Sequence, residues 1–65
     1  MAELKNNVKR FRVRKAFTQE QLAFKVNCSR QLISSIERGK MVPSVLIALK
    51  IAKILEVCVD DIFTF

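Results

Sequence analysis

The chain contains no histidine, tryptophan or tyrosine, and its two cysteines, Cys28 and Cys58, stand 30 residues apart. Without histidine and without a Cys-x-x-Cys pair, the sequence lacks the usual ligand pattern of a zinc or haem site. It also lacks a paired-carboxylate cleft, and neither cysteine has a basic partner at catalytic spacing, which argues against an enzyme. We expect no metal, no cofactor, no small-molecule ligand, and two reduced intracellular thiols.

Long apolar runs are missing as well, although 51% of the 65 residues are apolar. No segment approaches the roughly 18 apolar residues of a membrane span, and the first residues hold no apolar signal core. These absences predict a soluble cytoplasmic protein with no membrane partner. The length allows one domain at most, 1–65, and a domain this small is only marginally stable.

Glycine and proline occur once each, at Gly39 and Pro43, and no segment alternates in the manner of a strand. Few chain breakers together with helical periodicity predict an all-α fold. The almost unbroken apolar stretch 45–49 places the fourth helix at the centre of the core. We expect five helices, at about 2–15, 18–26, 29–37, 44–55 and 59–63.

Capping residues mark several of these helix ends. Thr18 followed by Gln21 forms a capping-box pattern at the start of the second helix. Ser29 and Ser44 are candidate N-caps of the third and fourth helices. Asn27 tolerates the left-handed conformation that often ends a helix.

Positive charge is concentrated in the first part of the chain. Residues 1–40 hold ten Lys or Arg against three Glu, a net charge of +7. Residues 41–65 hold two Lys against three acidic residues, a net charge of −1, so the total is +6. The asymmetry favours a polyanionic partner over a merely solubilising surface.

The stretch SRQLISSIERGK (29–40) has two different faces. At about 100° per residue, Ile36 and Glu37 fall beside Ile33, on the side toward the core. The opposite side carries Gln31, Ser34, Ser35 and Arg38, with Arg30 on one flank. These types suit the major groove, where Gln pairs with adenine, Arg with guanine, and Ser with several base edges. An ordinary solvated face is the alternative, and this helix alone leaves both open.

The spacing of the second and third helices favours a DNA-reading face over an ordinary solvated face. Only a few residues join 18–26 to 29–37, so these helices cross steeply, as in a helix-turn-helix motif (about 18–37). In that motif the first helix lies over the DNA backbone, and the second enters the major groove.

Residues 17–63 resemble the Xre-like, Cro/repressor-type helix-turn-helix transcriptional regulators. The marks are, in order, TQEQLA at 18–23, SRQ at 29–31, IERGK at 36–40, PS at 43–44, ALKIAK at 48–53 and VDDIF at 59–63. The resemblance implies a compact five-helix bundle of the lambda-repressor-like type. It also implies binding to double-stranded operator DNA, usually as a homodimer, in a prokaryotic nucleoid or as a phage-encoded protein.

The resemblance implies roles for individual residues. Gln19 matches a position that contacts a phosphate and braces the recognition helix, and Thr18 caps its helix beside the DNA backbone. Arg12 and Glu37 match an ion pair beneath the recognition helix. That pair is either an exposed bridge of ~0–1 kcal/mol or, as the inward position of Glu37 favours, partly buried. Base-reading positions are Arg30, Gln31, Ser34 and Ser35; phosphate-binding positions are Thr18, Gln19, Ser29, Arg38, Lys40 and Arg12.

The chain departs from its relatives at several helix ends. Relatives often carry glycine where this chain has Ala16, Asn27 and Glu56. If these sites are left-handed, the alanine and the glutamate are strained, whereas the asparagine is tolerated. Cys58 stands at an N-cap position and caps poorly, while Cys28 is expected to be a buried structural thiol. We therefore expect a modestly stable monomer, or stability gained from association.

Apolar residues occur where relatives more often have polar ones, at Met41, Val42 and Leu46, and again at the end of the chain, at Phe63 and Phe65. A bundle of this size cannot cover all five, although Phe63 is expected to complete the monomer core. Exposed apolar clusters mark interaction surfaces. We predict a two-fold homodimer through the fourth helix, the fifth helix and the tail, with recognition helices spaced for half-sites about one DNA turn apart.

The leading interpretation is a sequence-specific DNA-binding regulator that acts as a repressor. The alternative is an antitoxin-like interaction module that neutralises a protein partner while binding its own promoter, which the exposed apolar residues also fit. Leu32 is left with two roles, packing on the second helix or touching a thymine methyl in the groove.

Overall fold

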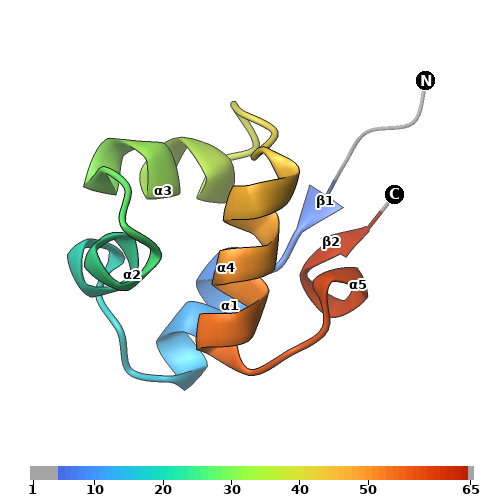
Figure 1. The fold of residues 1–65 in the computed structure, drawn as a ribbon, viewed down its shortest axis with the longest axis horizontal. Helices are drawn as coiled ribbons and strands as arrows, with labels where there is room; N and C mark the ends of the chain where they lie inside the picture. Colours follow the sequence, from blue (N-terminus) through green and yellow to red (C-terminus); the bar gives the residue numbers. More distant parts are fainter. Residues whose placement is uncertain (1–4, 65) are drawn as a thin grey trace.

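The computed structural model describes residues 5–64, and five helices account for most of them (Figure 1). The helices are α1 (Val8–Arg14), α2 (Gln19–Val26), α3 (Arg30–Glu37), α4 (Val45–Leu55) and α5 (Val59–Ile62). Two short strands, β1 (Lys5–Asn6) and β2 (Phe63–Thr64), pair antiparallel. The predicted all-α class with five helices is confirmed, with this small strand pair added. No helix within 5–64 is long and apolar enough to cross a bilayer.

One apolar core lies between the helices. In Figure 1, α4 crosses the middle of the molecule in front of α1, with α2 and α3 to one side and α5 to the other. The fully buried side chains are Val8, Leu22, Val26, Ile33, Ile36, Ile51, Leu55 and Ile62, so every helix contributes at least one. No polar or charged residue within 5–64 is buried in this core, so the core itself is stabilised by the burial of apolar side chains.

The predicted helix caps are confirmed. The Gln21 N–H donates to Thr18 Oγ1 at 3.0 Å, and the Thr18 N–H donates to Gln21 Oε1 at 2.8 Å, which completes the capping box. The Ser29 hydroxyl accepts from the Leu32 N–H at 3.0 Å, and the Ser44 hydroxyl caps α4 in the same way. These bonds satisfy amide groups that a helix start leaves without partners.

Three residues other than glycine adopt a left-handed backbone, as their positions at helix ends suggested. Ala16, Asn27 and Glu56 have φ values of 60°, 66° and 59°. Asparagine tolerates this region, but alanine and glutamate bring a Cβ too close to the following carbonyl oxygen. The sharp turns after α1 and α4 therefore store backbone strain. Gly39, with φ of 72°, ends the turn after α3 without that strain.

The predicted bounds of the first and last helices are wrong. The first helix was expected from residue 2, but α1 begins at Val8, and residues 1–4 lie outside the described part. Asn6 in β1 lies opposite Phe63 in β2. Because Phe63 belongs to this strand, α5 ends at Ile62 rather than at residue 63. The Asn7 N–H donates to the Ile62 carbonyl at 2.7 Å. A pairing between residues so distant in sequence leaves no local pattern to detect.

The fourth helix was expected at the centre of the core, and α4 does cross the middle of the molecule (Figure 1), but the apolar stretch 45–49 on which that expectation rested is largely exposed. Val45, Leu46 and Leu49 are 76%, 61% and 52% exposed. The core contacts of α4 come mainly from its second half, where Ile51 and Leu55 are fully buried. Even a central helix of a small bundle buries only the face that its neighbours cover, and an all-apolar stretch does not show which face that is.

Candidate nucleic-acid interface

The recognition helix predicted from the sequence is α3, and its two faces differ sharply. Ile33 and Ile36 are fully buried, while Arg30 and Gln31 are exposed. Ser34 and Ser35, two further residues of the predicted base-reading set, are half-buried. Leu32 was expected either to pack on the second helix or to touch a thymine methyl. In the structure it is partly buried and packs against the core.

The turn between α2 and α3 is short and well defined. Asn27 takes the left-handed conformation, and the Cys28 N–H donates to the Ala23 carbonyl at 2.9 Å. Ser29 then caps α3. Because α2 and α3 pack directly on each other, the pair forms a steeply crossed helix-turn-helix unit, in which the N-terminal end of α3 is accessible.

Glu37 joins the three helices that carry the site. Its carboxylate accepts from Arg12 Nε at 2.7 Å and from Arg12 Nη2 at 3.3 Å. The Gln19 side chain on α2 donates to the same carboxylate at 3.1 Å. The two side chains of the ion pair are 11% (Arg12) and 4% (Glu37) exposed, so the structure contains the expected pair in its partly buried form. α1 and α2 thus hold the C-terminal turn of α3 in place.

Arg12 makes a third bond, from Nη1 to the Phe17 carbonyl at 2.7 Å. Both terminal nitrogens and Nε are therefore used inside the protein. With 11% of its side chain exposed, Arg12 holds the site together, and its contact with a phosphate stays a prediction.

The other residues predicted to meet phosphates lie around the ends of α2 and α3. Thr18 and Ser29 are exposed N-caps, Gln19 is half-buried, and Arg38 and Lys40 are exposed on the loop that follows α3. The Lys40 N–H donates to the Ser35 carbonyl at 2.9 Å, which ties this loop to the helix. Donors therefore flank α3 at both of its ends.

An apolar patch lies on the loop after α3 and the start of α4. Met41 and Val42 are 50% and 69% exposed, and Leu46 is 61% exposed, as the predicted dimer surface requires. Val45 and Leu49 extend the patch; the sequence alone does not single them out, because the whole stretch 45–49 indicates a central helix. Phe63 packs against the core, and Phe65 lies outside the described residues.

Phe24 on α2, which is 85% exposed, was also missed. It lies on α2, whereas the apolar patch lies on the loop after α3 and on α4. A single exposed aromatic residue is common on protein surfaces.

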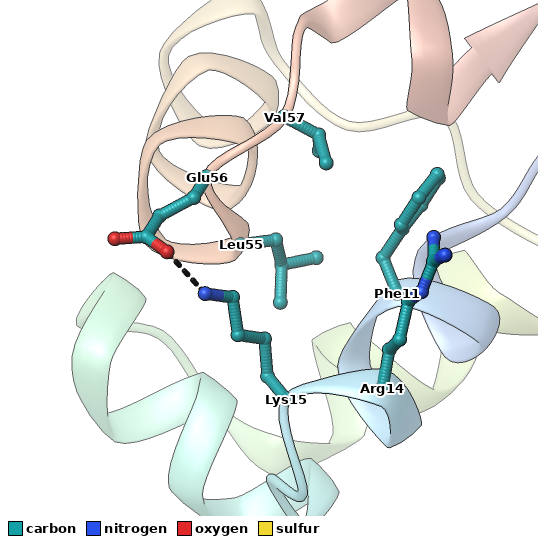
Figure 2. A pocket seen from close by; sticks show the side chains of 6 residues that line it. All are labelled: Phe11, Arg14, Lys15, Leu55, Glu56 and Val57. Atoms are coloured by element: carbon teal, nitrogen blue, oxygen red, sulfur yellow. Dashed lines mark hydrogen bonds and ion pairs between the residues drawn. The ribbon is translucent and has the colours of Figure 1, made fainter.

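A half-open pocket of about 320 Å³ is lined by residues at the C-terminal ends of α1 and α4 (Figure 2). In Figure 1 these two helix ends lie on the side of the molecule away from α3. Figure 2 shows Lys15 and Glu56 joined by an ion pair, and in this view Leu55 lies between the pair and Phe11. The hydrogen bond and the charge of Lys15 hold the pKa of Glu56 below its usual value. The Arg14 guanidinium lies 5.8 Å from the centre of the Phe11 ring. None of the residues predicted to contact DNA lines this pocket.

Known proteins share both the sequence pattern and this geometry. A model of the helix-turn-helix family matches residues 8–62. The uncharacterized HTH-type transcriptional regulator YgzD of Bacillus subtilis is 43% identical over 60 residues, which cover 92% of this chain and 91% of the relative. An uncharacterized HTH-type transcriptional regulator of Methanocaldococcus jannaschii is 47% identical over 62 residues, which cover 95% of this chain and 94% of the relative.

Solved structures agree with these relatives. The restriction-modification controller protein C.AhdI of Aeromonas hydrophila superposes with a TM-score of 0.78 at 30% identity, covering 83% of this chain and 82% of that one. The clp gene regulator ClgR of Corynebacterium glutamicum gives the same TM-score at 28% identity, covering 83% of this chain and 57% of that one.

Proposed function

This chain belongs to the Xre-like helix-turn-helix family of DNA-binding transcriptional regulators, and from that premise we propose that it is a homodimeric repressor that reads a specific operator with α3. The family consists of regulators and not of enzymes. The proposal concerns how this chain recognises its operator, which residues touch the DNA, and how two copies act together on one site.

The observation that carries the proposal is the way α3 is held. Its outward residues are polar and accessible, and its C-terminal turn is held by Arg12 and Gln19 through Glu37. A helix held on two sides presents its side chains to base edges in one orientation, which lowers the entropy lost on binding. In our proposal the base-reading residues are Arg30, Gln31, Ser34 and Ser35. Arg and Gln supply paired donors and acceptors for guanine and adenine, and the serines allow close approach.

Phosphate contacts surround this reading surface in the proposal. Thr18 and Gln19 at the start of α2 would meet one strand of the backbone, and Arg38 and Lys40 after α3 would meet the other, with Ser29 between them. The net charge of +7 in residues 1–40 supports a strong, salt-dependent contribution from phosphates. Arg12 remains in this set as a proposed contact, although three of its five N–H donors already bond inside the protein.

The homodimer in the proposal uses the exposed apolar patch of Met41, Val42 and Leu46, together with Val45 and Leu49. A two-fold pair would carry two copies of α3 at a spacing near one DNA turn, about 34 Å. Occupying both half-sites would repress by blocking access to the promoter. In the alternative, the chain is itself an antitoxin-like module that binds a different protein through this patch, and co-purification of a different small protein with a monomeric chain would favour that alternative.

Selection of bound sequences from random duplex DNA tests the proposal. We expect a consensus with two-fold symmetry. Arg30→Ala and Gln31→Ala should each weaken binding to it by ~1–3 kcal/mol and relax the preference at particular base pairs. Arg10→Ala, which removes an exposed arginine of α1, is the matched control and should leave the consensus unchanged. Unaltered preferences in Arg30→Ala and Gln31→Ala would refute the reading role of α3.

Lys40→Ala separates phosphate binding from base reading. We expect weaker binding to every duplex, with the same consensus and a salt slope reduced by about one counterion. A selective loss at particular base pairs would instead make Lys40 a reading residue.

A further inference from the structure

Asn6 connects the end of α3 to the strand pair. Its side-chain amide donates to the Ile36 carbonyl in the last turn of α3 at 2.8 Å. Its carbonyl oxygen, Oδ1, accepts from the Val8 N–H at 3.3 Å and so serves the start of α1. An asparagine is needed for both bonds, because an aspartate could accept from Val8 but could not donate to Ile36.

The backbone of Asn6 belongs to the pairing of the two terminal segments. Asn6 lies opposite Phe63, and Lys5 lies opposite Thr64. The Asn7 N–H donates to the Ile62 carbonyl at 2.7 Å. In an antiparallel ladder, hydrogen-bonded pairs alternate along the strands, so Lys5 and Thr64 form the next bonded pair. The position of Asn6 therefore depends on the pairing of β1 with β2, and separating the strands would release its backbone.

The turn that Asn6 holds leads directly into the loop after α3. The Gly39 N–H donates to the same Ile36 carbonyl at 3.0 Å, and the Arg38 N–H donates to the Ser34 carbonyl at 3.0 Å. The Glu37 carboxylate, one residue after Ile36, is held by Arg12. Two adjacent residues of this turn are thus bonded to the N-terminal part of the chain. The Ile36 backbone carbonyl accepts from Asn6, and the Glu37 side chain accepts from Arg12.

We propose that Asn6 is a positioning residue for DNA recognition, which couples the pairing of the terminal strands to the orientation of α3 through its bond to Ile36. This inference rests on the proposed reading role of α3. By linkage, whatever separates β1 from β2 weakens operator binding, and operator binding in turn stabilises the strand pair. The chain ends become a place where a partner or a modification alters affinity without touching DNA.

Asn6→Asp and Asn7→Asp form a matched test. Both variants exchange an amide for a carboxylate at adjacent positions, and both add one negative charge. The Asn7 side chain donates to the Asp61 carbonyl at 3.2 Å, so its variants loosen a contact between the terminal segments but leave the bond from Asn6 to α3 in place. We expect Asn6→Asp to bind the selected duplex about fivefold more weakly than Asn7→Asp, the loss of one hydrogen bond. Asn6→Ala against Asn7→Ala repeats the comparison without added charge, should either aspartate variant fold poorly.

Amide hydrogen exchange of the free protein provides a readout without DNA. The Arg38 and Gly39 amides should exchange faster in Asn6→Ala than in Asn7→Ala, relative to amides in the middle of α4. A general loss of stability would speed exchange everywhere, whereas a loosened turn speeds it locally.

A double-mutant cycle tests the coupling itself. Thr64→Pro removes one amide donor from the strand pair at an exposed position. We expect Thr64→Pro to weaken duplex binding in the parent and to add little in the Asn6→Ala background, because the link to α3 is already broken. Fully additive losses, or equal binding by the Asn6 and Asn7 variants, would overturn the proposal. A parent chain without any sequence preference would overturn the role in recognition, while the exchange rates would still show whether Asn6 holds the turn.

Discussion

Arg12 and Glu37 are 25 residues apart in sequence, yet Arg12 Nε lies 2.7 Å from Glu37 Oε2 in a nearly buried ion pair. Gln19 shares the same carboxylate at 3.1 Å. One acidic side chain therefore fixes α3 against both α1 and α2. The pair satisfies its own hydrogen-bonding groups, and no buried side-chain nitrogen or oxygen within 5–64 is left without a partner.

Arg12→Ala should destabilise the fold by about 3 kcal/mol or more, because it leaves the Glu37 carboxylate buried without its cation. Urea unfolding followed by circular dichroism measures the change. Lys15→Ala breaks the other ion pair, with Glu56, whose side chain is 72% exposed, and should have little effect because solvent screens exposed pairs. Equal effects of the two substitutions would show that burial does not distinguish these ion pairs.

Ala16→Gly should stabilise the fold by about 1 kcal/mol, because glycine adopts the left-handed conformation of this position without a steric cost. Thermal and urea unfolding both report the change. Ala48→Gly, in the middle of α4, is the control and should destabilise by about 0.5–1 kcal/mol. A loss of stability in Ala16→Gly would mean that the entropy of the unfolded chain outweighs the strain.

Leu46→Glu should convert the proposed dimer into a monomer, because it places a charge within the exposed apolar patch. Sedimentation at tens of micromolar gives the mass of the parent and of the variant. Phe24→Glu makes the same kind of change at an exposed apolar residue on α2 and should leave the dimer intact. A monomeric parent at this concentration would rule out the homodimer.

Cys28 should react with a thiol reagent more slowly than Cys58, since Cys28 is half-buried and Cys58 is exposed. Burial raises the pKa of the Cys28 thiol above its ordinary value, although nearby Lys50 acts in the opposite direction. The folded chain thus keeps this proton to a higher pH than the unfolded chain, so its contribution to stability is complete below the ordinary thiol pKa and is lost as the pH rises beyond it. Labelling rates of Cys58→Ser and Cys28→Ser across alkaline pH measure this difference, and equal rates would contradict it.

Much of the fold could be predicted because its signals are local. Thr18, Ser29 and Ser44 mark helix starts through bonds that span three residues, and the buried positions of α3 follow its helical period. The same period separated Gln31 from Ile33, which is why the outward face of the candidate site could be described without coordinates. The roles of its residues on DNA stay predictions.

Other features depended on parts of the chain that meet only after folding. The pairing of Asn6 with Phe63 joins the two ends of the described chain, and no short-range pattern reports it. The exposure of Val45 and Leu49 depends on which side of α4 the other helices cover. The three bonds of Arg12 join residues 5 and 25 positions away in the chain, and only folding brings these groups together.

Helix type, helix caps and the polar face of α3 follow from interactions among residues a few positions apart, so they were already encoded in the order of the amino acids. Which apolar surface stays exposed, and how Asn6, Arg12 and Gln19 together hold the end of α3, depends on distances between segments that are far apart in the chain. Packing sets those distances, because each helix can bury only the face that its neighbours cover.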